Sequence, residues 1–193
     1  MLASASPRRL ELLSTIGIEP RVVPSAVDES LRPGEPPELY VARLAAAKAE
    51  AVQRLLGDPG QETAPVVLGA DTIVCVEGRI LGKPRDDADA RAMLRALAGG
   101  WHRVVTAICA LHVSDRWETT STTDVRFRPL DDDEIDRYVA TGEGRDKAGS
   151  YAVQGIGMGF VPEIRGSYAN VVGLPIVETL ALLREAGAVH RWP

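Results

Sequence analysis

The sequence predicts a mixed α/β fold of two lobes. Strand-like and helix-like segments alternate along the 193 residues, and two long strand-like segments, 101–113 and 117–127, are separated by only three residues. The alternation is typical of helices packed on a sheet, and the short connection favours an antiparallel pair within that sheet. With 45% hydrophobic and 25% charged residues, the chain can bury a sizeable core. We therefore expect residues 1–193 to form a single domain built of two lobes.

Charge and cysteine content exclude several classes of function. The formal net charge of −5 leaves no global basic field for nucleic acid, so any anion must be bound by a local cluster. Cys75 and Cys109 lie in apolar strand-like runs, which predicts buried free thiols in a reducing compartment and no zinc site. No apolar run approaches the roughly 20 residues of a membrane span, and no signal peptide precedes the first strand. We expect a soluble, cytoplasmic protein.

The first turn of the chain predicts an anion site. Residues 2–4 form a short strand-like segment, Ser6 is a good N-cap, and Pro7 suits the first helical position. Arg8 and Arg9 then lie in the first helical turn, where the helix dipole disfavours positive charge. Two guanidinium groups beside free backbone N–H groups suit a phosphate. The alternative is a solvated arginine pair on an exposed turn.

A lysine interrupts the apolar stripe of the next predicted helix. After a short strand at 19–23 and a polar loop at 24–30, Pro36 and Pro37 open an alanine-rich helix that ends at Gly57. Position 48 lies on its apolar stripe and is lysine. Because a buried charge is costly unless it is paired, either Lys48 extends its ammonium to the solvent or it points into a polar cleft.

An aspartate interrupts the most strand-like segment of the chain. A Gly/Pro/Glu loop at 57–65, expected to be mobile, precedes a strand at 66–76, which a hairpin joins to 79–81. Asp71 stands within this strand, although aspartate is rare in strands and almost never buried without a partner. Strand periodicity sends Asp71 and Thr72 to opposite faces unless a bulge near Gly69 or the strand end intervenes.

The second half of the chain continues the alternation. Helices are predicted at 86–97 and 131–140, the segment 142–173 is punctuated by glycine, and Pro175 begins a final amphipathic helix. The three histidines, at positions 102, 112 and 190, share no ligand spacing and are expected to be structural or exposed.

Several charged residues stand in loops or against the local pattern. Together they could move a phosphoryl or nucleotidyl group, because cations would bind a polyphosphate while carboxylates hold Mg²⁺ and orient a water. The basic members are Arg8, Arg9, Lys48, Lys83 and Lys147, and the acidic members are Glu29 and Asp71. The chain has neither a P-loop motif nor a Rossmann glycine motif.

These residues lie in motifs that resemble a known family. The motifs, in chain order, are S-A-S-P-R-R at 4–9, V-D-E at 27–29, Lys48, G-A-D-T at 69–72, G-K-P at 82–84, D-K-A-G-x-Y-x-x-Q-G at 146–155 and G-S-Y-x-N-V-V-G-L-P at 166–175. The chain is similar in these motifs to the Maf family of nucleoside triphosphate pyrophosphatases. The resemblance implies a two-lobed α/β fold with a central cleft, related to the inosine triphosphate pyrophosphatases. It also implies metal-dependent hydrolysis of a nucleoside triphosphate to monophosphate and pyrophosphate, often by a homodimer.

The resemblance also implies roles for individual residues. Asp71 is the expected catalytic base, with Lys48 and Lys83 as catalytic cations, and Glu29 and Asp71 are the expected ligands of Mg²⁺ or Mn²⁺. The expected substrate-binding and specificity residues are Ser6, Arg8, Arg9, Thr72, Lys147 and Gln154.

The choice of base divides the family into branches. Arg8, Thr72 and Gln154 match the branch that acts on dTTP and UTP. The alternatives are a pyrophosphatase for 7-methyl-GTP or another noncanonical nucleotide, and a non-enzymatic regulator of cell division or a nucleic-acid-binding module. The acidic net charge argues against nucleic acid.

Overall fold

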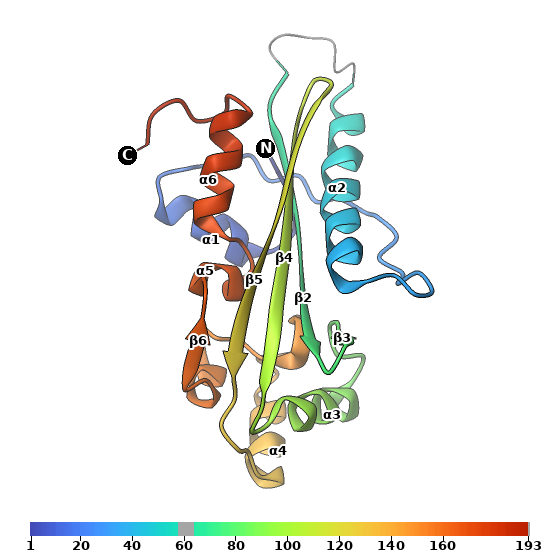
Figure 1. The fold of residues 1–193 in the computed structure, drawn as a ribbon, viewed down its shortest axis with the longest axis vertical. Helices are drawn as coiled ribbons and strands as arrows, with labels where there is room; N and C mark the ends of the chain where they lie inside the picture. The colour runs from blue at the N-terminus through green and yellow to red at the C-terminus, as the bar shows by residue number, and fades with distance from the viewer. Residues whose placement is uncertain (58–63, 193) are drawn as a thin grey trace. The chain divides into compact units, whose positions relative to one another are not determined.

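The computed structural model confirms the mixed α/β class. It describes residues 1–57 and 64–192, so most of the loop predicted at 57–65 lies outside the described residues. Strands β1, β2, β4, β5 and β6 follow one another in that order across a sheet, and β3 pairs with β2 (Figure 1). The strands are β1 (Leu2–Ala3), β2 (Val67–Val76), β3 (Arg79–Leu81), β4 (Trp101–His112), β5 (Asp115–Arg126) and β6 (Glu163–Arg165).

The helices follow the predicted pattern, with short additions. The α-helices are α1 (Pro7–Thr15), α2 (Pro37–Leu55), α3 (Asp87–Leu97), α4 (Asp132–Thr141), α5 (Tyr168–Val172) and α6 (Ile176–Glu185). Two 3₁₀ helices, η1 (Ala148–Ser150) and η2 (Ile156–Phe160), lie between α4 and β6. The acidic residues predicted to start α3 and α4 are their N-caps: Asp86 accepts the Asp89 N–H at 2.8 Å, and Asp131 accepts the Glu134 N–H at 2.8 Å.

The chain divides into two compact units. The first comprises Met1–Asp71, Thr106–Ser121 and Gly173–Pro193, and the second comprises Thr72–Val105 and Thr122–Val172. The expected cleft, and the description of residues 1–193 as one domain of two lobes, stay predictions.

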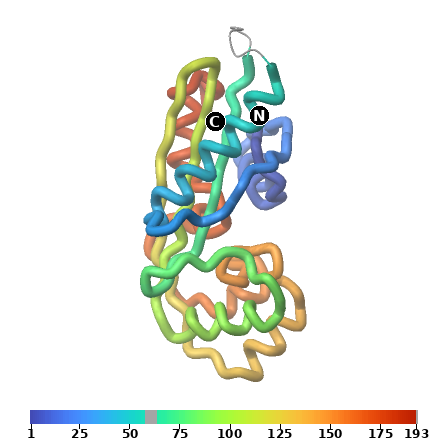
Figure 2. The backbone as a smooth tube through the Cα atoms, turned by 90° about the vertical axis from the view of Figure 1, so that its right-hand side faces the viewer, coloured from blue at the N-terminus to red at the C-terminus, as the bar shows by residue number. Residues whose placement is uncertain are grey.

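Helices flank the strands of the first unit, where β1 pairs in parallel with β2 and Leu2 lies opposite Leu68 (Figures 1 and 2). Leu68 and Ala70 of β2 belong to one hydrophobic cluster with Leu13 of α1 and Leu182 of α6. Successive side chains of a strand point to opposite faces, so the intervening Gly69 faces the other way, towards α2.

Gly69 allows α2 to approach β2 very closely. A Cβ atom at this position would lie 2.2 Å from the Ala45 carbonyl oxygen and 2.9 Å from the Ala49 Cβ. Only glycine facing an alanine-rich helix permits this backbone approach. The glycine in β2 and the alanines in α2 therefore set the distance between this helix and the strand.

Aromatic rings and a histidine pack together in the second unit. Phe127 makes edge contacts with His102, Tyr151 and Phe160 at centroid distances of 5.0, 4.8 and 5.7 Å. His102 is buried, which agrees with the structural role predicted for it. Its Nε2 lies 2.9 Å from the Tyr151 hydroxyl.

The structure corrects three local predictions. The strand expected at 19–23 is reduced to one parallel bridge between Val22 and Leu2, because the two-residue β1 offers no longer partner. Ser6 occupies the N-cap of α1, but its side chain makes no capping hydrogen bond. The segment 142–173 is more regular than its glycines suggest, since η1, η2, β6 and α5 all lie within it.

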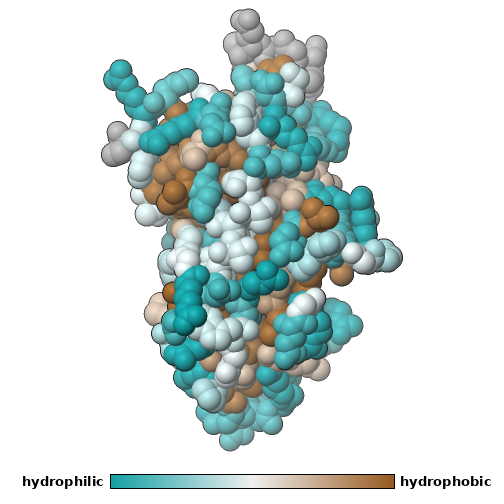
Figure 3. All heavy atoms as spheres, in the orientation of Figure 1, coloured by the Kyte–Doolittle hydropathy of each residue, from teal (hydrophilic) through white to brown (hydrophobic). Residues whose placement is uncertain are grey.

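The predicted burial of the two cysteines is confirmed, because Cys75 and Cys109 are both buried and neither forms a disulfide. Among residues 1–57 and 64–192, no helix has the length and hydropathy needed to cross a membrane. Apolar side chains gather over α6 on the face drawn in Figure 3, and Val177 of this helix is exposed.

Candidate active site

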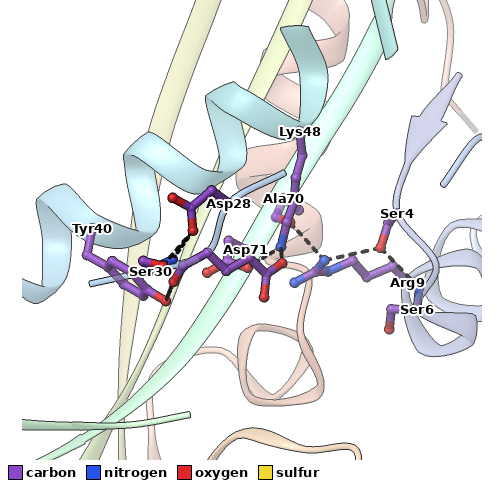
Figure 4. Close-up of polar contacts among 10 residues, drawn as sticks. Ser4, Ser6, Arg9, Asp28, Ser30, Tyr40, Lys48, Ala70 and Asp71 are labelled. Carbon is purple, nitrogen blue, oxygen red and sulfur yellow. Dashed lines mark hydrogen bonds and ion pairs between the residues drawn. The ribbon is translucent and has the colours of Figure 1, made fainter. Parts of the chain in front are cut away.

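Arg9 is anchored inside the first unit. Its Nε donates to the Gly173 carbonyl at 2.8 Å. Its Nη1 donates to the Ala70 carbonyl at 2.8 Å and to the Ser4 hydroxyl at 3.2 Å (Figure 4). The side chain is 8% exposed, so the solvated-pair alternative is wrong for this arginine. Burial lowers the pKa of the Arg9 guanidinium and the Asp71 carboxylate opposes the shift, but an arginine stays protonated in proteins. Arg9 is therefore a fixed positive charge beside β2.

The two arginines of the predicted anion site differ in burial. Arg8 is half-buried, whereas Arg9 points into the unit. Successive residues of a helix project about 100° apart, so the pair cannot act on one group from one direction. Ser4 joins this corner because its hydroxyl also accepts the Ser6 N–H at 3.1 Å, a role that its position in the motif did not reveal.

Lys48 and Asp71 form a buried ion pair. The Lys48 ammonium lies 2.6 Å from Asp71 Oδ1 and 2.7 Å from Glu29 Oε1. Lys48 and Asp71 are 9% and 8% exposed, so the interpretation in which Lys48 extends to solvent is wrong. Lys48 can reach Asp71 because α2 approaches β2 closely at Gly69. The turn of α2 that packs on Gly69 runs from Ala45 to Ala49 and includes Lys48.

Two opposing influences act on the pKa of the Asp71 carboxyl group. Burial raises this pKa above the usual value, while the charges of Lys48 and Arg9 act in the opposite direction and the net shift is upward. β2 runs without a break from Val67 to Val76, so no strand end separates Asp71 from Thr72. Strand periodicity therefore directs the two side chains to opposite faces.

Two side chains of α2 hold the loop that carries Glu29. The Tyr40 hydroxyl, labelled in Figure 4, donates to the Glu29 carbonyl at 2.8 Å. Arg43 Nη2 donates to the Ser30 carbonyl at 3.0 Å. Arg43 also forms a two-pronged ion pair with Glu35, with distances of 2.6 and 2.7 Å. The Glu29 side chain itself is half exposed. Tyr40 and Arg43 were not predicted from the sequence. Their only signal was that they lie on the turns of α2 that precede Lys48.

The remaining predicted residues belong to the second unit. Lys83 and Gln154 are exposed, and Thr72 is half-buried. The Gly149 N–H donates to the Gly82 carbonyl at 3.1 Å, which brings the segment of Lys83 beside that of Lys147. The Lys147 ammonium donates to the Glu143 carbonyl and to Asp146 Oδ1, both at 2.6 Å. The structure thus groups the predicted residues into two sets, one in each unit.

The predicted residues that lie in the first unit suit chemistry on a phosphate group. They combine a buried carboxylate of raised pKa, two fixed cations and a second carboxylate, and they adjoin the first turn of α1, whose leading N–H groups have no helical partner. Such a set can bind an anionic group, neutralise developing negative charge and accept a proton.

Comparisons with known proteins agree with this chemistry. The pattern of the family described as Maf-like protein matches residues 1–186. A relative from Anaeromyxobacter dehalogenans, named dTTP/UTP pyrophosphatase, is 51% identical over 100% of this chain and 96% of its own length. Relatives with the same name from Shewanella oneidensis and Hahella chejuensis are 51% and 48% identical, over 98% and 97% of this chain and 98% and 92% of their own lengths.

A solved structure extends the comparison only slightly. The Ham1 protein of Staphylococcus aureus has a TM-score of 0.43 and 17% identity, over 65% of this chain and 70% of that one. The sequence matches, in contrast, cover nearly every residue of the chain. The chain belongs to the family of Maf-like proteins.

Proposed function

We propose that this chain is a nucleoside triphosphate pyrophosphatase that hydrolyses dTTP and UTP to the monophosphate and pyrophosphate. The observation that carries the proposal is the buried Asp71, held 2.6 Å from the Lys48 ammonium in the middle of a strand. A buried aspartate in the middle of a strand costs stability unless its charge is compensated. Its presence there therefore supports a role in a reaction. The names of the relatives support the substrate assignment.

Asp71 and Glu29 suit a divalent metal ion in their chemistry. Both present hard carboxylate oxygens to a single cation, the Lys48 ammonium, and such oxygens are the ligands that Mg²⁺ and Mn²⁺ prefer. No group of three or more His, Cys, Asp and Glu able to hold a metal ion occurs in the described part of the chain. Asp71 and Glu29 are the two residues that would hold the ion. The ion would neutralise charge on the phosphates.

The proposed reaction is attack of water on the α-phosphorus. The water oxygen forms a bond to the α-phosphorus while the bond from that atom to the bridging oxygen breaks, and pyrophosphate leaves with the electron pair. Asp71 accepts the proton of the water, and its raised pKa makes it a stronger base than an ordinary aspartate. Lys48 and Lys83 neutralise the charge that develops, as preorganised cations do.

The remaining roles concern binding. Arg9, Ser6 and the first N–H groups of α1 hold the phosphates, and Lys147 is a further substrate-binding residue. Arg8, Thr72 and Gln154 choose the base. The Gln154 amide can donate and accept at once, which suits the edge of a pyrimidine. We further propose a homodimer that acts in the cytoplasm, as the resemblance to the family implies.

The test is a substrate panel. Purified protein is incubated with Mg²⁺ or Mn²⁺ and each standard triphosphate, together with 7-methyl-GTP, and the products are resolved by chromatography. We expect monophosphate and pyrophosphate, with dTTP and UTP turned over fastest. Release of diphosphate and phosphate would contradict the proposed bond of cleavage, and preference for 7-methyl-GTP would contradict the substrate.

A further inference from the structure

One carboxylate of the second unit accepts three hydrogen bonds from groups near Gln154. Glu143 Oε1 accepts the Ile156 N–H at 2.8 Å, and Oε2 accepts the Gly157 N–H at 3.0 Å and the Tyr138 hydroxyl at 2.8 Å. These bonds favour the ionised carboxylate. They outweigh the opposing effect of burial and lower its pKa.

The same acid and phenol hold the chain on both sides of Gln154. The Tyr138 hydroxyl, which donates to Glu143, also accepts the Ala152 N–H at 3.0 Å. Residue 152 precedes Gln154 by two positions, and residues 156 and 157 follow it by two and three. Gln154 itself is exposed at the centre of this bracket.

Glycines stand where the bracket closes. A Cβ atom at position 155 would lie 1.9 Å from Glu143 Oε1, and one at position 157 would lie 3.0 Å from the Tyr138 hydroxyl. The backbone after Gln154 therefore packs directly on the acid and the phenol. Glu143 also fixes the other predicted substrate residue of this segment, because its carbonyl accepts the Lys147 ammonium.

We propose that Glu143, acting with Tyr138, is the positioning residue that fixes Gln154 and thereby sets the choice of base. The inference rests on the proposed function. An amide discriminates between bases only when its donor and acceptor are held in place before the base arrives, since a loose amide adapts to any edge. Glu143 touches no substrate in this role. Its ionised carboxylate holds two backbone N–H groups on one side of Gln154 and, through Tyr138, one on the other.

The experiment measures base selection separately from phosphate binding. In Glu143→Gln the amide nitrogen replaces one carboxylate oxygen and faces backbone donors. We expect the ratio of kcat/KM for dTTP to that for CTP to fall about tenfold or more, mainly through a higher KM for dTTP, because an amide that is no longer held in place adapts to either base. Inhibition by tripolyphosphate, which has no base, should be unchanged.

Two further variants and a control keep the result interpretable. Tyr138→Phe removes the hydroxyl that links Ala152 to Glu143 but leaves the bonds of Glu143 to the Ile156 and Gly157 N–H groups, so it should lower the ratio less. Gly155→Ala places a methyl group against the Glu143 carboxylate. Glu143→Ala removes that carboxylate and with it the clash. The double variant should therefore lose less selectivity than the sum of the two single effects. Glu163→Gln changes a half-buried carboxylate of the same unit, which pairs with Arg126 and Arg165, and should leave the ratio unchanged.

The outcomes separate the two proposals. A wild-type protein that releases no pyrophosphate from any triphosphate overturns the proposed function, and the inference falls with it. An active wild type whose Glu143→Gln variant keeps the dTTP to CTP ratio overturns the inference alone. Equal losses for every nucleotide and for tripolyphosphate, with a lowered melting temperature, would reduce Glu143 to a purely structural residue and likewise overturn it.

Discussion

The two units treat buried polar groups in opposite ways. The first unit buries Arg9, Lys48 and Asp71 as charges and compensates each with an opposite charge or with carbonyl oxygens. The second unit buries His102 as a neutral ring, because burial among aromatic side chains lowers its pKa to about 4. Burying an ion without compensation is costly, so a fold keeps a buried charge only where pairing or chemistry requires it. Arg9, Lys48 and Asp71 therefore form a charged cluster, whereas His102 and its aromatic neighbours form a neutral cluster.

The largest expected effect comes from the carboxylate of the charged cluster. Asp71→Asn keeps the shape of the side chain but removes the proposed base and a proposed metal ligand. We expect kcat for dTTP to fall by at least roughly 10²–10⁴-fold. Asp124→Asn, an exposed position of β5, is the matched control. Activity of the Asp71 variant within about tenfold of wild type would place Asp71 with the structural residues.

Lys48 tests whether the charges depend on each other. From the sequence alone, Lys48→Met is expected to be neutral or slightly stabilising if the apolar stripe of α2 is buried, since it removes a buried charge. The structure reverses this expectation, because the variant leaves Asp71 buried without its partner at 2.6 Å. We expect a loss of roughly 3–5 kcal/mol in the free energy of unfolding, as when one partner of a buried pair is removed.

The measurement is urea denaturation of Lys48→Met beside Lys48→Met/Asp71→Asn. The double variant should recover part of the lost stability, since the uncompensated carboxylate is gone. An unchanged midpoint in the single variant would mean that the ion pair contributes nothing to the fold.

The neutral cluster predicts a loss of stability in acid. The unfolded chain protonates the His102 imidazole below about pH 6.5, whereas the folded chain does so only near pH 4. Stability is therefore fully present above pH 6.5 and falls as the pH drops through this window, by roughly 2 kcal/mol at pH 5. His102→Gln should flatten the curve of unfolding free energy against pH, while His190→Gln, at an exposed position, should not. Parallel curves for wild type and His102→Gln would exclude this role.

The smallest expected effect concerns packing beneath the charged cluster. Gly69→Ala forces a methyl group into the Ala45 carbonyl, so α2 must move away from β2. We expect a loss of about 1–3 kcal/mol in unfolding free energy, and a fall in activity because Lys48 moves with its helix. Gly159→Ala, where an added Cβ meets nothing within 4 Å, is the control. Equal midpoints for both variants would show that the helix adjusts freely.

The sequence by itself determined most of the local structure. Turn residues, caps and apolar periodicity predicted α1, α2, α3, α4, α6 and the strands β1 to β5, because these signals act between neighbours in the chain. The misfit of Lys48 and Asp71 with their surroundings also marked them as candidates. The sequence left open whether Lys48 was solvated, since a helical stripe does not specify what lies opposite it.

Only the tertiary structure decided which of these residues meet. Lys48 and Asp71 are 23 positions apart and Arg9 and Gly173 are 164 apart, distances over which no local pattern acts. The close packing of α2 on Gly69 makes the first contact possible, and the burial of α1 against the strands makes the second. Glu143 gave no signal in the sequence because a glutamate just after a helix is ordinarily solvated. Its importance comes from the backbone N–H groups that the glycine-rich chain folds back onto it.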